Sequence, residues 1–219
     1  MQENLQFLWS IMPSLLDGAK VTFSVFGYTL FGALPLGLLI ALMRITKFYP
    51  LRAVASVYIW LLRGTPLLLQ LYFVYFGLPY MGLTLDRFTA AVVTFILNYS
   101  AYYAEIYRAG IQSIDQGQYE ASKALGMTYV QTMRRIIIPQ TIRRIIPPLS
   151  NETVTLVKDT ALITAIGVIE LLRRAKEAVN RTVNPIAFFG AAVIYLAVTL
   201  ILTVIFKKIE ERYSCYELR

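Results

Sequence analysis

The chain has 219 residues, of which 57% are hydrophobic and 16% are charged, and its formal net charge is +8. This composition is too apolar for an ordinary soluble domain and indicates a membrane protein. The absence of His and the single Cys, Cys215, exclude a His-ligated metal site, an internal disulfide and Cys/His catalysis. Lys and Arg stand in short clusters between long apolar runs, a pattern that argues against nucleic-acid binding.

Residues 1–17 carry Glu3 in place of a basic n-region, so we expect an uncleaved amphipathic lead-in rather than a signal peptide. Five apolar stretches then follow, each long enough for the helix of about 20 residues that crosses a bilayer. They lie at 21–43, 53–78, 88–107, 145–168 and 186–206. A soluble helical bundle is the alternative, but the first and fifth stretches are too long and apolar for it. We predict an all-α fold, a polytopic membrane helical bundle with five transmembrane helices in a single domain over 1–219.

The distribution of basic residues predicts the orientation of these spans. An odd number of spans places the termini on opposite sides, and Lys and Arg are more frequent in the segments 44–52, 108–144 and 207–219 than on the other side. The N-terminus is therefore expected outside and the C-terminus in the cytoplasm. The basic segment 173–181 runs against this rule. Apolar and small residues recur at helical spacing from Leu171 to Thr182, so we expect an amphipathic helix there on the outer face.

The second stretch carries a helix break near the bilayer midplane. Gly64 loosens the helix, Thr65 is a competent N-cap, and Pro66 lacks the N–H that would continue the preceding helix. A half-helix starting there leaves the N–H groups of Leu67 and Leu68 free to hold a substrate carboxylate at the positive end of the helix dipole. A structural proline kink is the alternative.

Polar residues in the third and fourth stretches lie at a similar depth. Asn98 is a candidate substrate contact or a hydrogen-bonding link between helices. Glu152 and Asp159 share one helical face, and a charged carboxylate near the bilayer centre costs about 2.5 kcal/mol or more unless it is paired or solvated. Glu152 is therefore a candidate for binding a cationic side chain, such as that of arginine, lysine or protonated histidine. An ion pair with Arg63 is the alternative. Asp159 is a further candidate substrate contact, or part of a structural or gating pair with Lys158.

The connection between the third and fourth stretches, at about 112–144, is long and falls on the cytoplasmic side. Good helix formers occupy 118–125, Gly126 can adopt the left-handed conformation that ends a helix, and Thr128 can cap a second helix. We predict a helix-turn-helix. Glu120-Ala121-Ser122, Gly126 and Ile136–Pro139 follow the pattern E-A-A, three residues, glycine, nine residues, I-x-L-P, with Ser for the second Ala and Ile for Leu.

This connection resembles the cytoplasmic EAA loop of permease subunits of ATP-binding-cassette importers. Segments 63–70, 100–111 and 158–162 are similar to the polar amino-acid branch of that family. The resemblance implies that the loop couples to an ATPase through Glu120, Ala121, Gly126, Ile136 and Pro139. It also adds Gln70 to the candidate substrate contacts beside Thr65, and it implies a multi-pass protein of a bacterial-type plasma (inner) membrane.

The resemblance implies an amino-acid importer, with a basic or polar amino acid as the expected substrate. Its implied partners are an ATP-binding-cassette ATPase dimer, an extracytoplasmic amino-acid-binding protein, membrane lipid and a second permease subunit, in a homodimer or a heterodimer. The chain has no G-x-x-x-x-G-K-[ST] phosphate loop, so no cofactor is expected in it, and a partner ATPase would bind ATP and Mg²⁺. An ATP-independent secondary transporter and an intramembrane enzyme are the alternatives. The chain shows no nucleophile, base or metal-ligand set for an enzyme.

Overall fold

The structure, a computed structural model, describes residues 2–214, and every regular element in that range is helical. The α-helices are α1 (Gln2–Ile45), α2 (Tyr49–Gly64), α3 (Leu67–Tyr72), α4 (Arg87–Gln112), α5 (Gln116–Ala124), α6 (Tyr129–Thr132), α7 (Ile138–Asp159), α8 (Leu171–Thr182) and α9 (Ile186–Ser214). Turns of π-helix at Phe73–Gly77 and Met133–Ile137 and of 3₁₀-helix at Leu78–Met81 and Thr160–Ile166 join some of them. The all-α prediction is confirmed.

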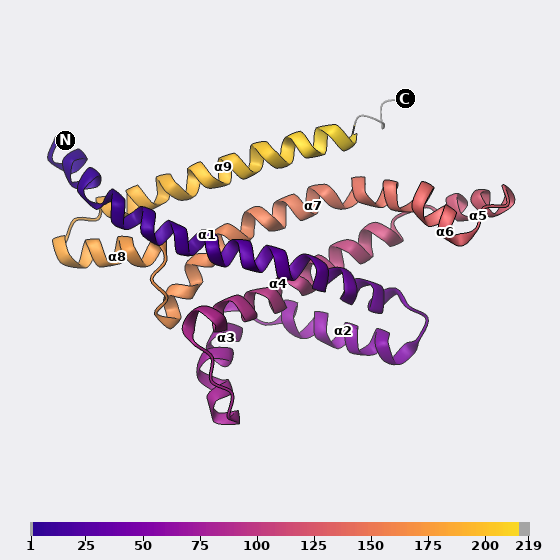
Figure 1. The fold of residues 1–219 in the computed structure, drawn as a ribbon, viewed down its shortest axis with the longest axis horizontal. Coiled ribbons are helices and arrows are strands. Elements are labelled where there is room, and N and C mark those ends of the chain that lie inside the picture. The colour runs from indigo at the N-terminus through magenta and orange to yellow at the C-terminus, as the bar shows by residue number, and fades with distance from the viewer. Residues whose placement is uncertain (1, 215–219) are drawn as a thin grey trace.

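The long helices α1, α4, α7 and α9 run along the longest dimension of the molecule (Figure 1). The start of α1 and the short helix α8 lie at one end of the bundle, whereas α5 and α6 project from the opposite end (Figure 1). The molecule therefore has two distinct ends, joined by a helical middle section.

Small residues allow α1 to pack closely against α4. Ala33 and Ala41 are completely buried, and a Cβ added to Gly37 would lie only 2.9 Å from the carbonyl oxygen of Ser100. Such close backbone approach is typical of helix pairs in membranes, where dispersion contacts replace the hydrophobic effect. The main core lies beside this contact and is built from Phe95, Tyr99 and their neighbours on α1, α3 and α7.

The helix break predicted in the second stretch is present, but its cap differs from the prediction. α2 ends at Gly64, and the helical segment Leu67–Met81 leaves it at 103°. Pro66, not Thr65, occupies the N-cap position of α3, and it makes no side-chain cap. The Thr65 hydroxyl instead donates to the carbonyl oxygen of Leu61 at 2.8 Å. A Thr hydroxyl readily donates to the helical carbonyl one turn before it. The Thr65 side chain therefore points back toward α2 and does not cap α3.

Two helices, α1 over Glu3–Ile45 and α9 over Ile186–Tyr213, are long and apolar enough to cross a membrane by themselves. The bent pair of α2 and Leu67–Met81 makes a third if it is one span. α4 and α7, which the sequence prediction also placed in the bilayer, fall short because polar residues such as Asn98 lower the hydropathy of α4, and charged residues such as Glu152 interrupt α7. The predicted stretch 145–168 is also not a single α-helix, since α7 ends at Asp159 and a 3₁₀ segment follows.

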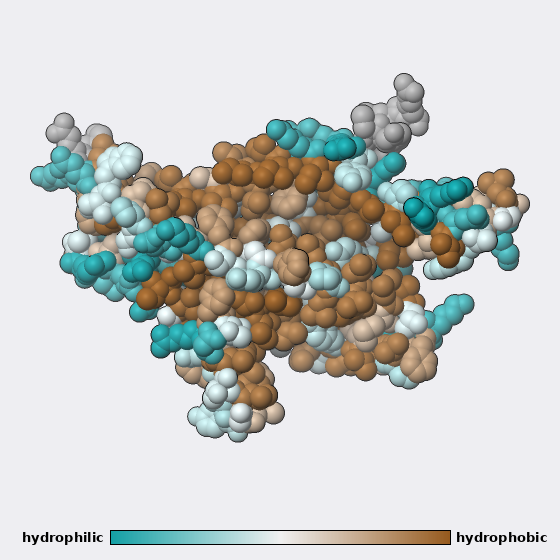
Figure 2. Space-filling view, in the orientation of Figure 1, coloured by the Kyte–Doolittle hydropathy of each residue, from teal (hydrophilic) through white to brown (hydrophobic). Residues whose placement is uncertain are grey.

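Much of the middle of the visible surface is apolar, and the polar residues gather toward its ends (Figure 2). Phe31 on α1 and Trp60 on α2 are 84% and 74% exposed, although both side chains are large and hydrophobic. A soluble monomer rarely exposes so much contiguous apolar surface. These exposed helices are therefore suited to contact lipid or another membrane-embedded subunit.

The connection at 112–144 forms the predicted helix-turn-helix. α5 ends just before Gly126, which has a φ of 72°. Thr128 caps α6 in a capping box: its hydroxyl accepts from the Gln131 N–H, and the Gln131 side chain accepts from the Thr128 N–H at 2.9 Å. The local sequence thus fixes this turn without help from distant parts of the chain.

Candidate functional site

A polar cavity of about 650 Å³ lies between α2, α4 and α7. Its lining residues are Arg63, Tyr102, Glu105, Ile106, Ala109, Gly110, Ser113, Arg144, Pro148, Asn151 and Glu152. The volume is in the range of small-molecule sites. Ser113 directly follows α4, and Arg144 belongs to the part of α7 nearest α5, so the cavity extends from the helix break toward the end of the bundle that carries α5 and α6 (Figure 1).

Charged groups of both signs line this cavity. The Glu105 carboxylate is paired with Arg108, whose Nε lies 2.9 Å away. Arg144 donates a hydrogen bond to the Ser113 carbonyl oxygen. Arg63 places its guanidinium carbon 5.2 Å from the centre of the Tyr102 ring, which is a cation–π contact.

Glu152 enters the cavity from α7 and is half-buried. Within residues 2–214 no ion pair includes Glu152 or Arg63, so the alternative of an internal pair between them is not formed. The cavity therefore presents one carboxylate and one guanidinium that have no ionic partner in the described part of the chain. Two such groups can receive the two opposite charges of a zwitterionic ligand.

Three other predicted substrate contacts, Thr65, Gln70 and Asn98, lie together at the helix break. The Gln70 amide donates to the carbonyl oxygen of Leu62 at 2.8 Å and to the Thr65 hydroxyl at 2.8 Å. The Asn98 amide donates to the same Leu62 oxygen at 3.0 Å and to Gln70 Oε1 at 2.9 Å. These bonds satisfy carbonyl groups left open where α2 ends.

The surroundings of these residues differ from those of Glu152. Thr65 and Gln70 line a separate, almost wholly apolar groove of about 610 Å³. The side chains of Leu67 and Leu68 pack against the main core. None of the predicted substrate contacts at the break lines the polar cavity. From this region of the chain, Arg63 lines the cavity instead.

Asp159, the last predicted contact, also lies apart from the polar cavity. Its carboxylate accepts a 2.7 Å hydrogen bond from the Tyr99 hydroxyl on α4. Lys158 faces grooves against α9 and makes no ion pair with Asp159 in the part of the chain that the structure describes. The structure thus brings Glu152 to one site and Asp159 to another, although both come from α7.

The family model described as "Binding-protein-dependent transport system inner membrane component" matches residues 33–214. The chain belongs to this family. It is 40% identical over 215 residues to the glutamine transport system permease protein GlnP of Escherichia coli (strain K12), covering 97% of this chain and 98% of that protein. It is 41% identical over 213 residues to the arginine transport system permease protein ArtQ of Bacillus subtilis (strain 168), covering 95% and 97% respectively.

Among solved structures, the fold is similar to a crystal structure of an amino acid ABC transporter with histidines. The TM-score is 0.86 at 39% sequence identity, and the match covers 92% of this chain and 94% of that one. These findings confirm the resemblance that the EAA loop indicated. The chain is an inner-membrane permease, a transport subunit, and ATP is bound by a separate ATPase subunit.

Family membership identifies the α5–α6 turn as the part of the permease that corresponds to the EAA loop. Glu120 and Ala121 are exposed on α5, and Ile136 and Pro139 are half-buried where the loop returns to α7. Sequence reasoning missed three apolar side chains at the turn, Leu125, Tyr129 and Val130, each at least 70% exposed. Their clustering on either side of Gly126 was the available signal.

Sequence reasoning also missed most of the lining of the polar cavity. Tyr102, Glu105 and Ala109 lie on one face of α4, Ser113 continues that face just past the end of the helix, and Asn151 adjoins Glu152 on α7. The spacing of i, i+3, i+7 and i+11 along α4 was visible in the sequence. The sequence did not show which helices this face would contact, because that depends on how α2 and α7 pack against α4.

Proposed function

We propose that this permease carries a basic or polar amino acid, such as arginine, lysine or histidine, in an ATP-driven importer. The observation that supports this most directly is Glu152, a carboxylate in the polar cavity without an ion pair among residues 2–214. A cationic substrate side chain would supply its counter-charge. Relatives named for glutamine and arginine transport, and a similar structure with histidines, support an amino acid as the substrate.

The break between α2 and α3 is the proposed site for the substrate α-carboxylate. Arg63 is the stronger candidate because it lines the same cavity as Glu152. The N–H groups of Leu67 and Leu68, at the start of α3, are the second candidate. Thr65, Gln70 and Asn98 would then shape this end of the site by holding the break, and Asp159 would hold its outer side through Tyr99.

The finer membrane topology is also a proposal. α1, the bent α2–α3 segment, α4, α7 and α9 would make five spans in one domain, with the N-terminus outside and the C-terminus in the cytoplasm. The polar faces of α4 and α7 turn toward the cavity and toward each other, which reduces the cost of placing them in a bilayer. The cavity would then open to the cytoplasm, as expected for an inward-facing state.

The proposed assembly contains a second permease subunit, identical to this one or different, an ATPase dimer and an extracytoplasmic amino-acid-binding protein. The exposed turn at Gly126, with Glu120 and Ala121 before it and Ile136 and Pro139 after it, would dock into the ATPase. The apolar side chains that flank the turn would be buried in that contact. ATP hydrolysis could then drive the permease between two states.

The deciding experiment is ATPase activity of the reconstituted importer in proteoliposomes, measured with each amino acid and its binding protein. Arginine, lysine or histidine is expected to stimulate hydrolysis most strongly, without any ion gradient. Stronger stimulation by an uncharged amino acid than by all three would overturn the charge assignment. To separate the carboxylate sites, Arg63→Gln is compared with Pro66→Ala and Thr65→Val: the variant that abolishes the preference for a free carboxylate over its amide identifies the site.

A further inference from the structure

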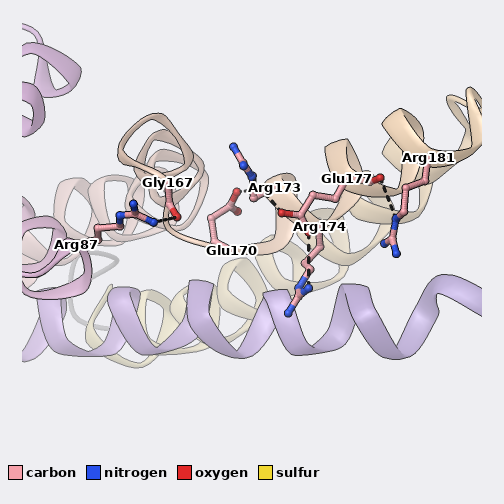
Figure 3. A network of polar contacts seen from close by, with 7 residues as sticks. All are labelled: Arg87, Gly167, Glu170, Arg173, Arg174, Glu177 and Arg181. Carbon is pink, nitrogen blue, oxygen red and sulfur yellow. Dashed lines mark hydrogen bonds and ion pairs between the residues drawn. The ribbon is translucent and has the colours of Figure 1, made fainter.

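α8 carries an unusual charge for its place in the permease. It contains four basic residues, Arg173, Arg174, Lys176 and Arg181, and one acid, Glu177. In the proposed topology α8 lies at the outer end of the bundle, where the positive-inside rule disfavours Lys and Arg. Figure 3 shows Arg173, Arg174, Glu177 and Arg181 extending from successive turns of α8, with Arg87 contacting Gly167 in the loop that precedes it. This excess charge needs an explanation other than topology.

The apolar face of α8 is already covered by the protein. Leu171, Ala175 and Ala178 are buried, and α8 packs against both α1 and α9. The approach to α1 is close, because a Cβ added to Gly18 would lie 2.9 Å from the Glu170 carbonyl oxygen. A helix that binds a membrane surface instead presents its apolar face, often with aromatic residues, to lipid. α8 has no aromatic residue, so lipid is a poor partner for it.

Glu170 holds α8 in a fixed position. Its side chain is completely buried and accepts hydrogen bonds from the N–H groups of Leu172 and Arg173, both at 2.7 Å. The Tyr195 hydroxyl on α9 donates to the same carboxylate at 3.1 Å. The outward face of α8 is therefore preorganised, and a partner would not have to order it on binding.

The charges on this outward face are only partly compensated. Glu177 lies 3.2 Å from Arg173 and 3.7 Å from Arg174, so one carboxylate serves two guanidinium groups. Lys176 and Arg181 are exposed, and neither makes an ion pair with the acids that the structure describes. We call Arg173, Lys176 and Arg181 the basic face of α8.

We propose that the basic face of α8 is a docking surface for an acidic patch on the extracytoplasmic binding protein. The proposal rests on the proposed function and topology. A rigid, water-facing basic surface fits a folded acidic protein better than a lipid headgroup layer, because α8 has no apolar face left to insert. Exposed charges at the edge of an interface mainly accelerate and orient encounter, so the contact should be salt-dependent.

The test uses the whole importer in nanodiscs of zwitterionic lipid, titrated with the substrate-loaded binding protein that stimulates its ATPase. The variant Lys176→Gln/Arg181→Gln should raise the half-maximal concentration about 3- to 10-fold at about 50 mM salt and under about 2-fold at 500 mM. Lys47→Gln/Lys208→Gln removes the same charge from the other end of the bundle and should change nothing. Equal maximal rates and melting temperatures would show that α8 is intact.

The outcomes separate this inference from the proposed function. An unchanged half-maximal concentration in the α8 variant overturns the docking surface alone. A shift that appears only in nanodiscs containing anionic lipid assigns the basic face to lipid headgroups and also overturns it. If no amino-acid-binding protein stimulates the unmodified complex, the proposed function and the docking surface fail together.

Discussion

The side-chain amide of Asn98 on α4 donates a 2.9 Å hydrogen bond to Gln70 Oε1 on α3, and both amides also donate to the carbonyl oxygen of Leu62 on α2. Three helices thus meet at one set of amide bonds. The break in the second stretch is therefore a fixed joint rather than a loose kink. Its geometry aims Arg63, one residue beyond Leu62, toward the polar cavity.

Replacing these two amides tests whether the joint is cooperative. Asn98→Ala and Gln70→Ala should each lower the free energy of unfolding by about 1–3 kcal/mol, because the Leu62 carbonyl loses a donor. The double variant should show a coupling of about 0.5–2 kcal/mol between them. Unfolding of the purified complex in detergent measures this, with the exposed Leu69→Ala as control. Additive losses would contradict a joint. A loss of substrate affinity at full stability would make Gln70 and Asn98 substrate ligands.

Substitution of Gly126 tests coupling between the permease and the ATPase without introducing a steric clash. No atom lies within 4 Å of a Cβ added there, so only the φ of 72° opposes a side chain. Gly126→Ala should cost about 1–2 kcal/mol at the turn and reduce substrate-stimulated ATPase activity. Gly27→Ala is the matched control, since its Cβ also meets open space but its backbone is helical. Full stimulation in the Gly126 variant would show that the turn is not needed for coupling.

The parts of the fold that follow from local sequence were predictable. Gly126 and Thr128 define the α5–α6 turn by themselves, and the spacing of small and apolar residues defines α8. The cap at the helix break was not predictable in the same way. Thr65 was free to cap α3, but its hydroxyl donates to the Leu61 carbonyl one turn back in α2 and accepts from the Gln70 side chain, which only the bent structure brings close.

Within the candidate site, Glu152 could be identified from the sequence alone, because a charged carboxylate in an apolar span has a high free-energy cost unless it is paired or solvated. The rest depended on packing between helices. Asp159 follows Glu152 at helical spacing, yet its carboxylate accepts a hydrogen bond from the Tyr99 hydroxyl and does not line the cavity. Arg63 was considered as an ion-pair partner of Glu152, whereas the structure places the two in one cavity without pairing them.

Charge selection by Glu152 can be tested against a second carboxylate in the same cavity. Glu152→Gln preserves shape and should weaken binding of a basic amino acid by about 1.5–3 kcal/mol, the scale of a charge-assisted hydrogen bond. Glu105→Gln is the control, since Glu105 is already paired with Arg108. Binding to the purified complex by calorimetry gives both values. Equal losses for basic and uncharged amino acids in Glu152→Gln would remove the case for a direct charge contact.

Glu170 predicts a pH dependence of stability. Burial raises the pKa of its carboxyl above the usual 4.5, although the Leu172 and Arg173 N–H groups act in the opposite direction. The folded state therefore binds this proton more tightly than the unfolded state does. Its contribution to stability is complete below about pH 4.5 and is lost as the pH rises through the folded-state pKa. Glu170→Gln should flatten the melting temperature between pH 4 and 8, and Glu177→Gln on the surface of α8 should not. Parallel profiles for the wild type and Glu170→Gln would contradict this.

The proposed orientation can be tested by labelling single cysteines. Because Cys215, outside the described residues, is the one native cysteine, Cys215→Ser gives an unreactive background. In that background Lys176→Cys on α8 should react with a membrane-impermeant maleimide in spheroplasts, because the outer end of the bundle faces the medium. Lys123→Cys on α5 and Lys47→Cys between α1 and α2 are equally exposed but should react only after permeabilisation. Labelling of Lys123→Cys and Lys47→Cys before Lys176→Cys would invert the topology. It would place the basic face of α8 in the cytoplasm, where the positive-inside rule alone would account for its charge.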